Sequence, residues 1–350
     1  MLTSPDHEPP WRKVGNASAV LAALACGFGD QSRTACAQES SISRGLDTEN
    51  PKEWSLLIRS CWADIDVCLG RIQTTCISSS QTRTATSGIE GKGLYETLSI
   101  SGDTVTPSVR YHTTDETQDI GIDVINGNNV TMTQASKDPQ ILPVSFRQHP
   151  LGKIQVHIGQ GDALQKYSAK SIWHLLLREP EICRQHLIPL LDMLIASHHL
   201  MEDADQIEKG LLQKTGQPHI SRAEMTQLVS QMGNGKSEVR QHATAQLDAM
   251  GIQALPFLES MEMFTLAPEQ SSRVRDTTHR MKEKYTKNGD TASKKDSVDR
   301  ALLWLFEDPE IWSIFLQRAD PEQQAIALRE LRAMFPGKTE QELMRKYGKR

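Results

Sequence analysis

The hydrophobic period of this chain changes near Ser168, and this change constrains the fold more than any other feature of the sequence. Before it, apolar and polar residues alternate, which is the pattern of strands with one buried face. After it, apolar residues recur every three or four positions, as in amphipathic helices. We therefore predict an α+β protein in which an antiparallel β-rich N-terminal domain precedes a larger α-helical region.

The β-rich domain is predicted over residues 51–165. Its clearest signal is the alternation over 120–124, which breaks at Asn-Gly-Asn (126–128) and resumes over 130–132. Asn and Gly tolerate the positive φ of tight hairpin turns, so this stretch predicts a hairpin. Other alternating apolar residues predict further strands: Leu98 with Ile100, Val144 with Phe146, and Ile154 with Val156 and Ile158.

Two segments of this domain are expected to be other than regular strands. Residues 51–72 place apolar residues at three- and four-residue spacing and predict one leading helix. Residues 77–93 are rich in Ser, Thr and Gly and predict a loop, with an irregular strand within it as the alternative. A small sheet needs a covering element, so we expect the leading helix, or the helices after 168, to cover it.

The helical half is divided at glycines, prolines and polar runs. Pro180 fits the first position of a helix, and residues 201–217 form an acidic stretch that we interpret as a connector. Asp308 and Asp320 each precede a Pro-Glu pair and are expected to cap helices. The predicted regions are a helical connector (166–221), a four-helix module (222–285), a linker (286–297) and three short C-terminal helices with a capping box at Thr339 and Glu342 (298–350).

A repeat-like motif lies within residues 222–285. The run from Ser237 to Thr244 (SEVRQHAT) is followed by Leu247, Gly251 and the run ALPFL at 254–258. These residues resemble a HEAT-like (armadillo-type) helical repeat module of exported bacterial proteins. The resemblance implies paired helices and a protein-binding surface, and it implies no chemistry. A second unit would start at residues 272–275, but it lacks a matching ALPFL helix, which implies a short module.

The N-terminus has the features of an export signal. Arg12 and Lys13 precede an apolar stretch over 17–28, which is too short to span a bilayer. Ala35-Cys36-Ala37 matches a cleavage site, so residues 1–37 are predicted to be a signal peptide and residues 38–50 a mobile mature N-terminus. The mature protein would be periplasmic or extracellular.

Lipoprotein processing is the alternative for the same segment. Cys26 follows Ala23-Leu24-Ala25, which resembles a lipobox without its usual branched residue. Lipidation at Cys26 would leave an N-terminal lipid anchor. No later segment is long and apolar enough to predict a transmembrane span.

Four of the six cysteines remain after cleavage at Ala37: Cys61, Cys68, Cys76 and Cys183. On one helix Cys61 and Cys68 would be too far apart for a disulfide. Cys76 could pair with either if the chain reverses near Gly70, and buried free thiols are the alternative. The absence of a CxxC pair argues against a zinc or thioredoxin-like site.

Possible binding and catalytic motifs all have simpler interpretations. His198, His199, Glu202, Asp203 and Asp205 are the only metal-like cluster, and their positions fit a solvated helix end. No Lys-Ser or Lys-Thr pair follows the glycines at 88, 91 and 93, and residues 159–162 (GQGD) fit a turn. No Gly-x-Ser-x-Gly elbow is present. We therefore predict no catalytic residues, no cofactor and no metal ligands.

Charge and composition limit the partners. The net charge is −5 and aromatic residues make up 5% of the chain, and both values argue against nucleic-acid binding. Residues 271–297 hold eight Lys or Arg against four Asp or Glu, a local excess of +4 that fits a solvated helix face and linker, with contact to an acidic polymer or a lipid headgroup as the alternative.

The leading functional expectation is a non-catalytic extracytoplasmic scaffold that binds a protein partner. An envelope-associated structural protein without a discrete ligand is the alternative, and an enzyme with an unrecognised site in the β-rich domain is the second alternative. We expect partner binding to map to residues 222–350. Trp304 and Trp312 are either interface anchors there or core residues.

Overall fold

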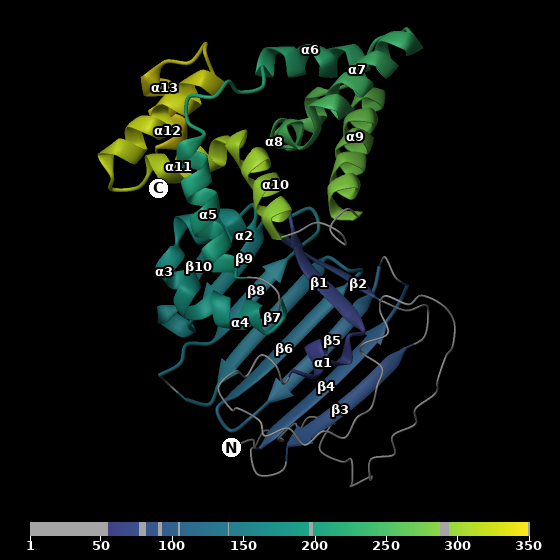
Figure 1. Ribbon diagram of the computed structural model, residues 1–350, viewed down its shortest axis with the longest axis vertical. Coiled ribbons are helices and arrows are strands. Elements are labelled where there is room, and N and C mark those ends of the chain that lie inside the picture. Colours follow the sequence, from purple (N-terminus) through teal and green to yellow (C-terminus); the bar gives the residue numbers. More distant parts are fainter. Residues whose placement is uncertain are drawn as a thin grey trace, which may run out of the picture. The chain divides into compact units, whose positions relative to one another are not determined.

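The computed structural model describes residues 55–76, 82–89, 93–103, 106–138, 140–195, 199–287 and 294–348. The chain divides after Leu46 into two units, and all described residues belong to the second, Asp47–Arg350. The predicted signal peptide (1–37) and mobile segment (38–50) lie outside the described residues. The described part is α+β as predicted, with an antiparallel sheet followed by helices (Figure 1).

The main sheet is an eight-stranded meander in which every strand pairs antiparallel with the next in sequence. The predicted hairpin is confirmed: Val124 lies opposite Val130, and Asn126 and Gly127 have φ of 54° and 73° in the turn. The strands are β3 (Arg83–Ile89), β4 (Leu94–Ser101), β5 (Ser108–Thr114), β6 (Gln118–Ile125), β7 (Asn129–Ser136), β8 (Val144–Gln148), β9 (Ile154–Ile158) and β10 (Gln165–Ala169).

One face of this sheet is apolar and buried, as the alternation predicts. The residues between the buried ones are mostly half-buried or exposed, so the sheet has one wetter face. The buried face consists of Leu98, Ile100, Val109, Tyr111, Ile120, Ile122, Val124, Val130, Met132, Val144, Phe146, Ile154, Val156 and Ile158.

The leading helix predicted over 51–72 is largely wrong. Within the described residues 55–72, only α1 (Leu56–Ser60) is helical, and Cys61 follows it with a left-handed φ of 52°. The rest forms a separate two-stranded hairpin, β1 (Ala63–Cys68) with β2 (Arg71–Cys76). The β-branched pair Ile65 and Val67 alternates with aspartates, so a strand buries both while a helix would separate them.

The hairpin β1–β2 and α1 cover part of the apolar sheet face, while helices after residue 168 contact β8 and β10. Gln148 of β8 joins the hairpin to the sheet, since its amide accepts from Ile72 N (2.9 Å) and donates to Ile72 O (2.8 Å). Glu96 of β4 accepts from Leu56 N at 3.0 Å and so holds the start of α1. Both expected covering elements are therefore used.

The segment 77–93, predicted as a loop with an irregular strand as the alternative, contains a regular strand. Residues Arg83–Ile89 form β3, which pairs with β4 along its length. Its Thr and Ser side chains are mostly exposed at the edge of the sheet, so no hydrophobic alternation marks the strand in the sequence.

The helical half has more helix than predicted. The acidic stretch 201–217 is mostly helix α5, and the linker expected over 286–297 is shortened by α9 and α10 from either side. Four helices, rather than three, follow it. The helices are α2 (Ile172–Arg178), α3 (Pro180–Ile182) with a π-helical turn (Cys183–Leu187) and α4 (Ile188–Asp192), α5 (Leu200–Gln213), α6 (Arg222–Met232), α7 (Ser237–Met250), α8 (Leu255–Glu259), α9 (Pro268–Lys287), α10 (Lys294–Phe306), α11 (Pro309–Leu316), α12 (Pro321–Met334) and α13 (Glu340–Tyr347).

Helices α6 to α9 form the four-helix region expected over 222–285. Ala243, Leu247, Leu255 and Leu258 of the repeat-like motif are buried, whereas its Val239 is only half-buried. Ser237 is the first residue of α7, and neither it nor the N-cap residue Lys236 makes a side-chain cap. Gly251 follows α7 with a positive φ of 65°, which glycine adopts without steric cost.

The C-terminal helices begin with the predicted caps. Asp308 accepts from Glu310 N (3.0 Å), Asp320 accepts from Glu322 N (2.9 Å), and Thr339 forms a capping box with Glu342. Trp304 and Trp312 are buried in this region, so they are core residues and not surface anchors. None of the helices in the described ranges combines the length and apolar character that a membrane span requires.

Candidate functional site

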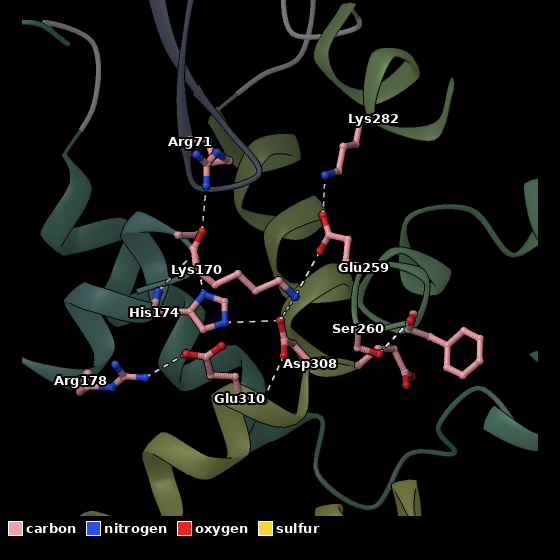
Figure 2. A network of polar contacts seen from close by, with 12 residues as sticks. Arg71, Lys170, His174, Arg178, Glu259, Ser260, Lys282, Asp308 and Glu310 are labelled. Atoms are coloured by element: carbon pink, nitrogen blue, oxygen red, sulfur yellow. Dashed lines mark hydrogen bonds and ion pairs between the residues drawn. The ribbon is translucent and has the colours of Figure 1, made fainter. Parts of the chain in front are cut away.

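Four charged side chains of alternating sign form a continuous network, buried at Asp308 and partly exposed at Lys282, where the sheet meets the helices (Figure 2). Lys170, directly after β10, places its Nζ 2.6 Å from Asp308 Oδ2 and 3.1 Å from Glu259 Oε2. Lys282 of α9 approaches the other oxygen of Glu259 at 2.7 Å. The network therefore joins β10 to α8, α9 and α11.

Local structure fixes where each of these groups points. Asp308 is the N-cap of α11, with Pro309 at the first helical position, so its carboxylate is held at the helix start. Glu259 is the last residue of α8. Lys170 lies between β10 and α2, and Arg71 of the β1–β2 hairpin donates to its carbonyl oxygen at 3.1 Å.

The members of the network keep one another charged. Burial alone raises the pKa of Asp308, but the Lys170 ammonium and His174 outweigh it and hold that pKa well below its usual range. Burial lowers the pKa of Lys170, yet the Asp308 and Glu259 carboxylates raise it overall. The pKa of Glu259 is lowered too, because Lys170 and Lys282 outweigh its burial.

A serine, a histidine and the aspartate of this network form a row in space in which each side chain contacts the next. Ser171 Oγ is 2.7 Å from His174 Nδ1, and His174 Nε2 is 3.4 Å from Asp308 Oδ2. The order is that of a nucleophile, base and acid, but Ser171 and His174 are both 0% exposed. Ser171 also caps α2 by accepting from His174 N. The group therefore organises the junction and offers no reacting atom to a substrate.

A second buried cluster surrounds His219, and its Glu307 directly precedes Asp308 of the first network in the chain. His219 places Nδ1 3.3 Å from Glu307 Oε2 and Nε2 3.1 Å from Glu330 Oε2, and its ring stacks on Phe306 at 4.5 Å. Burial lowers the pKa of His219, but the two carboxylates outweigh it and raise that pKa to about 9. His219 is therefore a cation at neutral pH.

The same two carboxylates also hold the backbone that connects α5 to α6. Glu307 accepts from Ile220 N at 3.2 Å and Glu330 accepts from Gly216 N at 3.0 Å. Arg222 donates to the carbonyl oxygen of Glu307 at 3.1 Å. The junction of α10 and α11 at residues 307–308 thus carries one acid for each cluster.

The metal-like residues near position 200, interpreted from the sequence as a solvated helix end, are not gathered at one point among the described residues. His199 and Glu202 are 3.7 Å apart on the surface, whereas Asp203 is buried. His198 lies outside the description. No group of three or more metal-ligating side chains occurs in the described part of the chain.

The glycine and basic segments also have structural roles. Gly159 and Gly161 have φ of 84° and 58° in the turn before β10, as expected for a loop. In the basic stretch 271–297, Arg273 pairs with Glu269 at 2.8 Å and Arg280 with Asp248 at 3.2 Å. Part of the predicted local excess of positive charge is therefore neutralised by acids from outside the stretch.

The cysteine geometry differs from the one expected. Cys61 and Cys68 do not share a helix, since Cys68 ends β1. Cys68 lies opposite Arg71 while Cys76 lies opposite Ala63, so five strand residues, roughly 16 Å, separate them along the hairpin. That is too far for a disulfide. Cys76 and Cys183 are buried free thiols, and burial raises the pKa of Cys183 to about 12.

The sequence patterns predicted neither of these two clusters. They predicted only that Asp308 caps a helix. The partners Lys170 and Asp308 are 138 residues apart, and no spacing rule connects them. The available signal was local: a Ser-x-x-His at the start of α2 and an acidic pair, Glu307-Asp308, directly before a proline.

Comparison with known proteins gives no match to a protein-family model, to a curated protein or to a solved structure.

Proposed function

We propose that this protein is a non-catalytic scaffold that binds a protein partner outside the cytoplasm, and that helices α6 to α9 carry the binding surface. The proposal includes the HEAT-like character of this region. Paired-helix modules of that kind bind partners through their exposed helix faces.

The observation that carries the proposal is Phe264, which is 85% exposed in the short turn between α8 and α9. Large aromatic side chains are enriched among the residues that dominate binding energy at protein interfaces. Close by in sequence, Phe257 of α8 is buried. The contrast fits a helical region with a core of its own and an aromatic side chain available to a partner.

The buried charge network supports this role because it holds the region in place. Lys170 joins β10 to Glu259 of α8, and Lys282 joins Glu259 to α9. A surface that is held rigidly before binding loses less conformational entropy when the partner docks.

Photo-cross-linking in intact cells tests the proposal with the full-length chain. A benzophenone amino acid replaces Phe264 or the exposed Gln246 of α7 in separate variants, and the exposed Gln165 of β10 in the control. We expect protein adducts from positions 264 and 246 and none from 165. Adducts from position 165 alone, or none from any position, would contradict the proposal.

A further inference from the structure

An open groove of about 590 Å³ lies between α5 and the first turns of α12. Leu212 of α5 and Ile326 of α12 are half-buried and give it an apolar floor. Four of its lining residues are acidic and one is basic: Asp205, Glu208, Asp320 and Glu322 against Lys209. The groove therefore combines apolar surface with a negative rim.

The acidic residues of the rim differ in how far they are already neutralised. Glu208 is held by Arg318, whose two terminal nitrogens lie 2.5 and 2.8 Å from its carboxylate oxygens. Asp320 caps α12 by accepting from Glu322 N at 2.9 Å. Asp205 and Glu322 are exposed and have no ion-pair partner within the described ranges. Negative charge without an ion-pair partner in the described ranges therefore lies on both sides of the groove, on Asp205 of α5 and on Glu322 of α12.

We infer that this groove binds an amphipathic, Lys- or Arg-bearing helix of a partner protein, an inference that rests on the proposed scaffold function and names the partner chemistry. Side-chain ridges of a third helix pack into the furrow between two helices, with apolar residues toward Leu212 and Ile326. Its cationic residues then face Asp205, Asp320 and Glu322. Charge complementarity of this kind selects partners and speeds association.

The probe is a synthetic 14-residue peptide with Leu at helical i, i+3, i+4 and i+7 positions and Lys at the others. A second peptide carries Glu in place of Lys. Calorimetric titration against the full-length protein should show binding of the Lys peptide, weakened by added salt because exposed charges are screened, and no binding of the Glu peptide.

The double variant Asp205→Lys with Glu322→Lys reverses the charges of the two rim residues that have no ion-pair partner in the described part of the chain. Its matched control, Asp162→Lys with Glu116→Lys, makes the same change in net charge at exposed turns of the sheet. We expect at least a tenfold loss of peptide affinity in the groove variant and less than a threefold change in the control. Thermal melting of both variants shows whether they are folded.

Hydrogen exchange on the unmodified protein supplies a readout that needs no variant. Bound Lys peptide should protect amides of residues 205–213 and 320–326. Equal affinities of the two double variants, or protection confined to other segments, would overturn the groove assignment. The cross-links from positions 264 and 246 decide the scaffold proposal separately, so the two failures are distinguishable.

Discussion

Lys170 and Asp308 are 138 residues apart in the chain, and Lys170 Nζ lies 2.6 Å from Asp308 Oδ2. The first residue follows the last strand of the sheet and the second begins α11. Because Asp308 is buried and Lys170 is only 26% exposed, either charge left alone would be poorly solvated. This contact makes the sheet and the C-terminal helices depend on each other for stability.

The substitution Asp308→Asn should lower the free energy of unfolding by about 3 kcal/mol. Asn can still cap α11, so the loss isolates the charge that faces Lys170. Breaking one side of a buried ion pair leaves the other charge uncompensated, which is the origin of the cost. Urea denaturation of the purified variant and parent measures the difference.

The matched control is Asp320→Asn, at the corresponding cap of α12. Asp320 also precedes a Pro-Glu pair and accepts from Glu322 N, but it is exposed. Its replacement should change the free energy of unfolding by less than about 0.5 kcal/mol. Equal losses in the two variants would show that capping, and not the buried charge, accounts for the effect.

His219 should stabilise the fold in a pH-dependent way. Its pKa rises from 6.5 to about 9 on folding, so the stabilisation is fully present below pH 6.5 and is lost as the pH rises through 9. The shift corresponds to about 3 kcal/mol. The gap in free energy of unfolding between the parent and His219→Gln should therefore shrink between pH 6.5 and 9.5.

The control for this titration is His279→Gln on α9. The side chain of His279 is 74% exposed, and its contact with Glu283 is long at 3.7 Å. Its replacement should leave the difference from the parent nearly constant over the same pH range. A pH-independent gap for His219→Gln would mean that His219 is not protonated in the folded protein.

Gly70→Ala should destabilise the protein more than Gly161→Ala. Both glycines have positive φ, 67° and 58°, so both substitutions carry a left-handed penalty of about 1–2 kcal/mol. At Gly70 the added Cβ would also lie 2.7 Å from Trp173, whereas at Gly161 nothing lies within 4 Å. Thermal melting of the two variants isolates the packing cost, and equal melting temperatures would contradict the close approach of the β1–β2 turn to α2.

Leu247→Asp should destabilise the helical region by several kcal/mol. Leu247 is fully buried on α7, and an aspartate there would be a buried charge without a partner. The neighbouring Gln246 is exposed, so Gln246→Asp is the matched control and should melt close to the parent. A Leu247→Asp variant that melts like its control would refute the packing of α7.

The fold could be predicted wherever hydrophobic period and local chemistry agree. Residues 120–132 combine strict alternation with an Asn-Gly turn, and the structure confirms a hairpin there. The caps at Asp308 and Asp320 were also found, because capping depends on the next few residues alone. At the hairpin, the structure adds only the partner strands across the sheet.

The failures have physical causes as well. The run 63–68 is so short that its apolar side chains fit both the two-residue period of a strand and the period near four of a helix. The β-branched residues in it favour the strand. Strand β3 is edge-exposed and polar, so no periodic signal marks it. The two buried clusters join residues more than 80 positions apart, and only the folded chain brings Lys170 to Asp308 or His219 to Glu307.

Export remains a prediction from the sequence, and it can be tested in cells with two pairs of substitutions. Leu21→Arg with Leu24→Arg places charges inside the apolar stretch and should leave an unprocessed chain in the cytoplasm, because a signal peptide needs an uninterrupted apolar segment. The matched control, Ser41→Arg with Ser43→Arg, lies beyond the predicted cleavage site and should be exported normally.

The site of processing separates a secreted protein from a lipid-anchored one. Cleavage at Ala37 gives a mature N-terminus at Gln38, which mass spectrometry of the intact protein identifies, and Cys26→Ser should leave that mass unchanged. Lipoprotein processing instead gives a chain beginning at Cys26 with an added lipid mass, and Cys26→Ser should abolish it. An intact Met1 terminus in the cytoplasm of unmodified cells would contradict export by either route, and with it the extracytoplasmic setting of the proposed scaffold.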